Sequence, residues 1–127
     1  LPPLLGVAEA QVVPSTFPEA FGMVAVEAAA CGALPVVADQ SGLGEVRAIL
    51  AGVVPEEAAS WLGFPLGDGT VEAIAARLIA WLTAPEELRQ ATRDALVSVA
   101  RERFSWDGVA QTMVRAALGD AADLPRP

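Results

Sequence analysis

Short apolar runs alternate with helix-like patterns along the chain. Residues 11–14 and 34–38 are short, largely apolar runs typical of strands buried on both faces, and residues 62–66 favour a third strand. Apolar residues three and four positions apart predict helices elsewhere. We expect the end of a helix at 4–10, a short helical insertion at 54–60, and longer helices at 23–31, 43–51, 70–82, 86–104 and 105–118. This alternation indicates an α/β fold with a parallel sheet covered on both faces.

Glycine, proline and hydroxyl residues mark where these elements begin and end. Gly32 predicts the end of a helix, and the run 83–86 (Thr-Ala-Pro-Glu) has the spacing of a capping box for the helix after it. Ser105 is expected to cap the last helix. In the helix over 70–82, a spacing of four predicts the buried stripe. Its expected members are Ile74, Leu78 and Leu82.

Composition narrows the class of protein. The 127 residues are 54% hydrophobic and 19% charged, which excludes a disordered chain, and no apolar run is long enough to span a membrane. The net charge of -8 argues against nucleic acid as a partner, since phosphate backbones need clustered cations. Lys and His are absent, which excludes Ser-His-Asp chemistry and histidine metal sites. A single cysteine, Cys31, favours a reducing compartment, so we predict a cytoplasmic protein.

The loop over residues 14–22 carries the candidate chemistry. It follows a predicted parallel strand and enters a helix at Gly22, which is where open α/β sheets bind ligands. Free backbone amides and the positive end of the helix dipole suit a phosphate there. Glu19 in the loop and Glu27 one turn into the helix would repel a phosphate, but their carboxylates can accept hydrogen bonds from sugar hydroxyls. Together these groups favour a sugar nucleotide.

The same stretch resembles the retaining glycosyltransferases of the GT-B fold, in particular glycosyltransferase family 4. The block over residues 18–28 (Pro-Glu-Ala-Phe-Gly-Met-Val-Ala-Val-Glu-Ala) contains the Glu-x7-Glu motif of that family as Glu19 and Glu27. The segments 32–38, 41–45 and 103–106 are also similar to the family, and the resemblance extends from Leu4 to about Ala117.

The resemblance implies a Rossmann-like, doubly wound parallel sheet: the carboxyl-terminal part of a truncated GT-B fold. Residues 1–119 would form a partial nucleotide-sugar-binding domain, followed by a flexible tail at 120–127. Glu19 would be the catalytic residue at the donor hexose, and Glu27 would bind the ribose. The implied donor-binding residues are Glu19, Ala20, Phe21, Gly22, Met23, Val24 and Glu27. No metal and no cofactor are implied besides the nucleoside-diphosphate sugar, which is the donor substrate.

The sequence also departs from the family pattern. The family usually has adjacent glycines and a proline before the position of Glu45, where this chain has Gly42-Leu43-Gly44. The acceptor-binding amino-terminal domain of the family, and the Arg and Lys that grip the diphosphate, have no counterpart here. We therefore expect the last, donor-binding part of a hexosyltransferase, inactive as an isolated chain, with the amino-terminal domain of the same enzyme as its partner. The alternatives are a non-catalytic remnant or interaction module, and a sugar-nucleotide epimerase.

Several of these side chains have simpler interpretations. Glu19 and Glu27 could each be a solvated surface acid, with Val24, Ala28 and Cys31 supplying the inward face of the helix. Tryptophan side chains are more often packing residues than platforms for sugar binding. The residues expected in the core or between helices are Trp61, Trp81 and Trp106.

Overall fold

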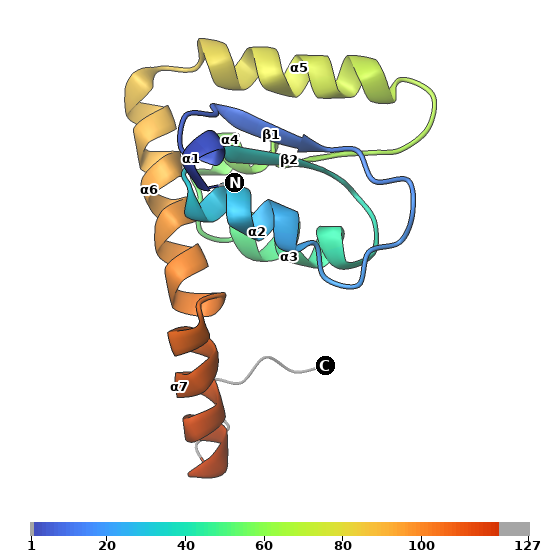
Figure 1. Ribbon diagram of the computed structural model, residues 1–127. Helices are drawn as coiled ribbons and strands as arrows, with labels where there is room; N and C mark the ends of the chain where they lie inside the picture. The colour runs from blue at the N-terminus through green and yellow to red at the C-terminus, as the bar shows by residue number, and fades with distance from the viewer. Residues whose placement is uncertain (1, 120–127) are drawn as a thin grey trace.

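The computed structural model describes residues 2–119 and has helices on both faces of a small sheet (Figure 1). The predicted tail at 120–127 lies outside the described residues. The strands are β1 (Ala10–Val13), β2 (Leu34–Ala38) and β3 (Gly63–Phe64). The helices are α1 (Pro2–Leu5), α2 (Met23–Ala30), α3 (Ser41–Ala51), α4 (Glu56–Ala59), α5 (Thr70–Thr83), α6 (Glu86–Arg103) and α7 (Trp106–Ala117). The predicted α/β fold is confirmed.

The three strands are parallel, as expected, in the order β1-β2-β3. All five residues of β2 are buried, which explains its continuous apolar run. Pro35 is tolerated in this central strand because β3 is only two residues long. Val37 is the first β2 residue to pair with it, so no strand stands where the missing N–H of Pro35 would donate.

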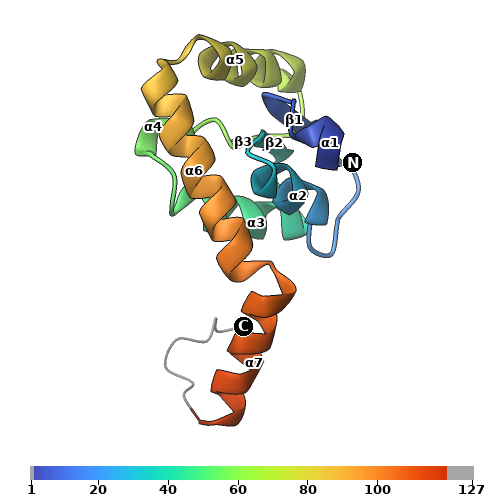
Figure 2. The ribbon, with the colours of Figure 1, turned by 60° about the vertical axis from the view of Figure 1, so that its left-hand side comes forward.

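Helices cover the sheet unevenly. α2 and α3 lie on one face and α5 lies on the other, while α6 packs against α2 at the side of the sheet (Figure 1). A doubly wound sheet reverses its strand order at one point along the sheet. The described strands follow one another in sequence order, so they contain no such reversal. The doubly wound description therefore stays a prediction. Beyond α6, the helix α7 projects away from the sheet in both ribbon views (Figure 2).

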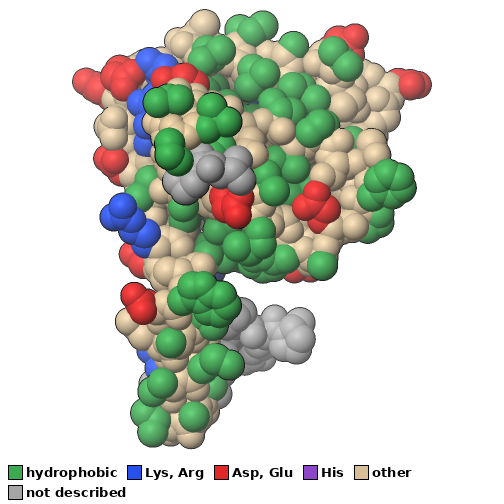
Figure 3. Space-filling view, viewed as in Figure 1, with side chains coloured by type: hydrophobic (Ala, Val, Ile, Leu, Met, Phe, Trp, Pro, Cys, Tyr) green, Lys and Arg blue, Asp and Glu red, His purple; other side chains and the backbone are tan. Residues whose placement is uncertain are grey.

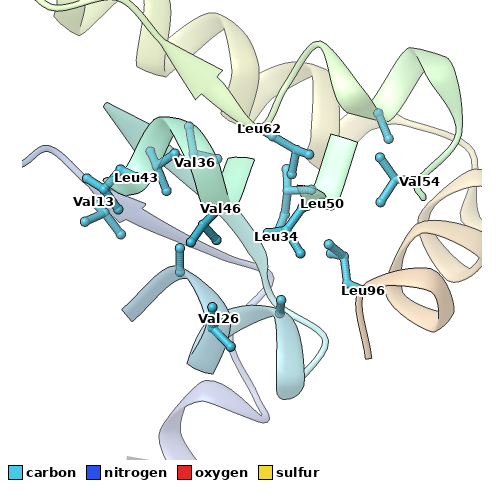
Figure 4. Packing of buried hydrophobic residues seen from close by; sticks show 14 of the residues in the cluster. Val13, Val26, Leu34, Val36, Leu43, Val46, Leu50, Val54, Leu62 and Leu96 are labelled. Atoms are coloured by element: carbon cyan, nitrogen blue, oxygen red, sulfur yellow. The ribbon is translucent and has the colours of Figure 1, made fainter. Parts of the chain in front are cut away.

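The core forms between β2, α3 and α6. Figure 4 shows Leu34 of β2, Val46 and Leu50 of α3, and Leu96 of α6 directed toward one another. All four side chains are at most 1% exposed. Truncating one such leucine to alanine costs about 2–5 kcal/mol in proteins, so this cluster is a principal source of stability.

Two expectations about packing are wrong. Leu82 was expected in the buried stripe of α5, but it is 52% exposed, and the fully buried residue there is Trp81. The indole of Trp81 donates a hydrogen bond to the Glu9 carbonyl at 2.9 Å and packs edge-on against Trp61, contacts that Leu82 could not make. Trp106, expected in a packed position, is 89% exposed at the start of α7.

The predicted capping box is also wrong. Thr83 is the last residue of α5, and its hydroxyl donates to the Ile79 carbonyl at 2.7 Å, one turn back in its own helix. The N-cap of α6 is Pro85, without a side-chain cap. The predicted cap of α7 is confirmed, because the Ser105 hydroxyl accepts a hydrogen bond from the Gly108 amide at 3.0 Å. Among residues 2–119, no helix combines the length and apolar character needed to cross a membrane.

Candidate functional site

The candidate site lies where β1 and β2 end. Residues 14–22, here called the carboxyl-edge loop, connect β1 to α2, and residues 39–40 connect β2 to α3. Because the two strands are parallel neighbours, both connections leave the same edge of the sheet (Figure 1). This is the edge at which open α/β sheets bind ligands.

Glu19 is held at both its side chain and its backbone. The Ser15 hydroxyl donates a hydrogen bond to Oε1 of the Glu19 carboxylate. The Gly42 amide donates to the Glu19 carbonyl at 3.0 Å. Glu19 is partly buried, unlike a freely solvated loop acid, and a carboxylate has several acceptor positions, so capacity remains for a ligand.

Gly22 shapes the start of α2. It has φ 77° and ψ 44°, in the left-handed region that favours glycine. A Cβ there would also lie 2.6 Å from Cδ2 of Leu43, so α3 packs closely behind this position. No side chain caps α2, and its first turn contains no acidic residue. The Ala25 amide donates to the Gly22 carbonyl at 3.0 Å, so the amides of Met23 and Val24 are the ones that remain available to an anionic ligand.

Glu27 lies on the outer face of α2. Met23 precedes it by four residues and Val24 by three, which places the three side chains on one side of the helix. All three are exposed, and within residues 2–119 no hydrogen bond or ion pair engages the Glu27 carboxylate. Four residues correspond to about 6 Å along the axis, so Glu27 lies within reach of a ligand at the helix start.

The expected inward face of α2 needs correction. Val24 was expected to point inward, but it is 39% exposed, and Cys31 follows the helix as its C-cap and is only partly buried. Ala28 is buried as predicted. The buried residues of α2 are Ala25, Val26, Ala28 and Ala29. Small side chains on this face let α2 approach β1, β2 and α6 closely.

Phe21 links the carboxyl-edge loop to the far end of the chain. Its ring is 41% exposed and contacts the Phe104 ring edge-on, with centroids 5.8 Å apart and planes at 64°. Phe104 is the C-cap of α6. The amino-acid pattern predicts Phe104 only as the end of a helix. The similarity of segment 103–106 to the family was a signal that it matters, but not of what it contacts.

The site is acidic and open. Residues 14–27 contain Glu19 and Glu27 but no Lys or Arg. The nearest basic residue along the chain, Arg47, forms an ion pair with Asp39 at 3.1 Å. A diphosphate at α2 would therefore be met by backbone amides. Within residues 2–119 no group of three or more His, Cys, Asp or Glu side chains could hold a metal ion.

A second polar cluster lies at the opposite edge, where β1 and β2 begin. This amino-edge cluster consists of Glu9, Glu86, Arg89 and Arg93. Nη2 of Arg93 lies 2.6 Å from Oε2 of Glu9, and Nη1 lies 3.0 Å from Oε1 of Glu86. Arg89 pairs with the same two acids. Figure 3 shows blue and red side chains intermingled beside the upper part of α6.

The amino-edge cluster has paired its own charges. Burial by itself lowers the pKa of Arg93, but hydrogen bonds to Glu9 and Glu86 and their negative charges raise it above its ordinary value. The Arg93 guanidinium also lies 5.6 Å from the centre of the Trp81 ring. A cavity of about 410 Å³ is lined by all four residues of the cluster together with Cys31 and Gly32 among others. Because acids and bases balance there, the cluster ties α6 to the sheet and has little charge left for a ligand.

The structure places the predicted site residues together at the start of α2, all of them at least partly exposed except the buried Gly22. Glu19, Ala20, Phe21 and Gly22 run along the loop into Met23 and Val24, and Glu27 follows one turn later. Parallel strands, an uncapped helix start and two acids at the carboxyl edge define an α/β domain of the kind that binds ligands at this edge.

Comparison with protein families identifies the domain further. Residues 1–97 match the family model described as glycosyl transferases group 1. The chain belongs to this family, whose match spans the sheet, α5 and most of α6 and ends before α7. Comparisons with curated proteins and with solved structures gave no match.

Proposed function

We propose that this chain is the donor-binding part of a retaining glycosyltransferase of the GT-B fold. The enzyme would transfer a hexose from a nucleoside-diphosphate sugar to an acceptor hydroxyl. The observation that carries the proposal is the placement of Glu19 and Glu27 on either side of the uncapped start of α2. In a chain that belongs to the group 1 glycosyltransferases, this surface offers amides for a diphosphate between two acceptors for sugar hydroxyls.

Each predicted residue has a separate task in this proposal. Backbone amides from Phe21 to Val24 bind the diphosphate and stabilise the negative charge that develops on the leaving group. Glu27 accepts hydrogen bonds from the ribose hydroxyls. Glu19 contacts the hexose and stabilises positive charge that develops at its reacting carbon. Neither a metal ion nor a further cofactor has a task in this scheme.

The open surface supports a partner domain. Ala20, Phe21, Met23 and Val24 are all exposed, so this face alone would leave a bound donor largely in water. We propose that an amino-terminal domain of the same enzyme closes the site and brings the acceptor, and that the chain by itself is inactive. Family membership favours this transferase over a remnant or an epimerase. A cytoplasmic location stays a prediction.

Two matched substitutions test the division of roles in the complete polypeptide that carries this sequence. Glu27→Gln removes a charged acceptor that acts in ground and transition states alike. It should raise the donor KM by roughly tenfold to a few hundredfold if about 1–3 kcal/mol is lost. Glu19→Gln removes charge that matters most in the transition state, so it should mainly lower kcat. Steady-state kinetics over a panel of nucleotide sugars measures both effects.

The control is Glu72→Gln, an exposed acid in the first turn of α5 on the other face of the sheet. It should leave kcat and KM unchanged, and circular dichroism should show all three variants folded. If the Glu19 and Glu27 variants also behave like the parent, the site assignment is wrong. A reversed pattern would keep the site but exchange the two roles.

A further inference from the structure

The segment after β2 donates hydrogen bonds to three backbone carbonyls of the carboxyl-edge loop. The Gln40 side-chain amide donates to the carbonyl of Ser15 and, at 3.3 Å, to the carbonyl of Phe17. Two residues later, the Gly42 amide donates to the Glu19 carbonyl at 3.0 Å. The contacts fall on every second residue of the loop, so they fix the path of the backbone from Ser15 to Glu19.

Gln40 does not act as an ordinary helix cap. It occupies the N-cap position of α3, but its side chain makes no capping hydrogen bond. Ser, Thr, Asp and Asn are the residues that cap helices well, and the longer glutamine side chain is suited to reach the loop instead. The amino-terminal end of α3 thus contacts the loop through the Gln40 side chain and has no side-chain cap of its own.

The approach of α3 to the loop is close enough to demand glycine. A Cβ on Gly42 would lie 2.6 Å from the Ala20 carbonyl oxygen and 2.6 Å from the Phe21 amide nitrogen. Ser41, between Gln40 and Gly42, has φ 46° and is the one non-glycine residue with positive φ within residues 2–119. This is a rarely populated conformation for a residue with a side chain. The neighbours of Ser41, which are Gln40 and Gly42, both donate hydrogen bonds to the loop, so the unusual conformation lies at the centre of this contact.

We propose that Ser15 and Gln40 are positioning residues for Glu19. Gln40 holds the backbone of Ser15, and the Ser15 hydroxyl donates to Oε1 of the Glu19 carboxylate. This hydrogen bond orients the carboxylate before the donor arrives, and the remaining acceptor positions of the carboxylate can then bind a ligand. The inference rests on the proposed role of Glu19, and neither positioning residue touches the donor.

The chemistry of the two residues predicts which substitutions matter. Ser15→Ala removes the donor to Glu19, whereas Ser15→Thr retains a hydroxyl. Gln40→Glu preserves size but replaces the donating amide by a carboxylate, which cannot donate to the carbonyls of Ser15 and Phe17. A matched control is Gln111→Glu, which makes the same chemical change at an exposed position of α7.

The test measures release of nucleoside diphosphate from UDP- and GDP-hexoses by the complete polypeptide that carries this sequence. We expect Ser15→Ala and Gln40→Glu each to lower kcat about tenfold with the donor KM changed less than about threefold. Ser15→Thr should recover most of the loss, and Gln111→Glu should match the parent. Circular dichroism confirms that each variant is folded.

A double-mutant cycle separates positioning from general damage to the loop. If Ser15 acts through Glu19, adding Ser15→Ala to Glu19→Gln should cause no further loss of kcat. Additive losses, or a parent-like Ser15→Ala beside an impaired Glu19→Gln, would overturn the positioning role and leave the proposed function standing. If Glu19→Gln itself matches the parent, the proposed site fails and the positioning role fails with it.

Discussion

The two edges of the sheet use the same residue type in opposite ways. At the amino edge, Oε2 of Glu9 accepts from both Arg89 and Arg93, so its charge is neutralised within the fold. At the carboxyl edge, Glu19 is held by the neutral hydroxyl of Ser15, which orients the carboxylate but leaves its charge in place. Within residues 2–119, the Glu9 carboxylate thus has two basic partners, whereas the Glu19 carboxylate has a hydroxyl partner and no basic one.

The edges also differ in how their backbone is supported. The amino edge is backed by the buried indole of Trp81, while the carboxyl edge is held by close approach of glycine backbone at Gly42. We therefore expect loss of Trp81 at the amino edge to act on global stability alone, and a substitution at Gly42 both to lower stability and to displace the candidate site. The predictions below test this separation.

The largest effect is expected at Trp81. Trp81→Ala removes a fully buried ring, its hydrogen bond to the Glu9 carbonyl and its contact with Trp61, and should lower the free energy of unfolding by about 3–5 kcal/mol. The control Trp106→Ala removes a ring that is 89% exposed and should change it by less than about 0.5 kcal/mol. Chemical denaturation measures both, and equal losses would contradict the packing described here.

An intermediate effect is expected at Gly42. Gly42→Ala forces a methyl group against the backbone of Ala20 and Phe21, which should cost about 1–3 kcal/mol and displace the carboxyl-edge loop. Gly44→Ala is the matched control in the same helix, because its Cβ would lie at an ordinary 3.5 Å from Oδ1 of Asp39. That control should be neutral or stabilising by up to about 1 kcal/mol, as expected for alanine inside a helix. Thermal and chemical unfolding decide between these opposite signs.

The smallest effect is expected for the pair Glu9 and Arg93. A double-mutant cycle with Glu9→Gln and Arg93→Met should give a coupling of about 0.2–1 kcal/mol, since the Glu9 side chain is 48% exposed and well solvated. The coupling should shrink in about 1 M salt. Because the pKa of Arg93 is raised, its contribution is lost only as the pH rises through that raised value, and it stays constant near neutral pH. A coupling that is unaffected by salt would contradict a solvated ion pair.

The local features of the fold were predictable because they depend on neighbouring residues. The apolar run at 34–38 predicted the central strand, and Ser105 predicted the start of α7. The helix start expected at Gly22 correctly predicted Glu19 in a loop and Glu27 in a helix. The capping box failed because the Thr83 hydroxyl finds a nearer acceptor within α5.

The contacts that shape the candidate site were not predictable from spacing. Phe21 meets Phe104 from the far end of the chain, and Gln40 reaches Ser15 across 25 residues. Both contacts depend on where α3 and α6 pack, which the pattern of apolar residues does not specify. The sequence could propose which residues form the site, but the three-dimensional packing was needed to show what holds them.

The joint between α6 and α7 has a mechanical consequence. Gly108 lies so close to the Glu102 carbonyl that a Cβ there would overlap it, and the Ser105 hydroxyl bonds to both sides of the bend. The bend is therefore set by contact between the two helices. A 12-residue helix is about 18 Å long. A side chain at position 108 that changed the angle between α6 and α7 by about 10° would therefore move the far end of α7 by about 3 Å. The absence of a side chain at Gly108 therefore sets the angle between α6 and α7. That angle in turn determines where the exposed side chains of Met113 and Leu118 lie.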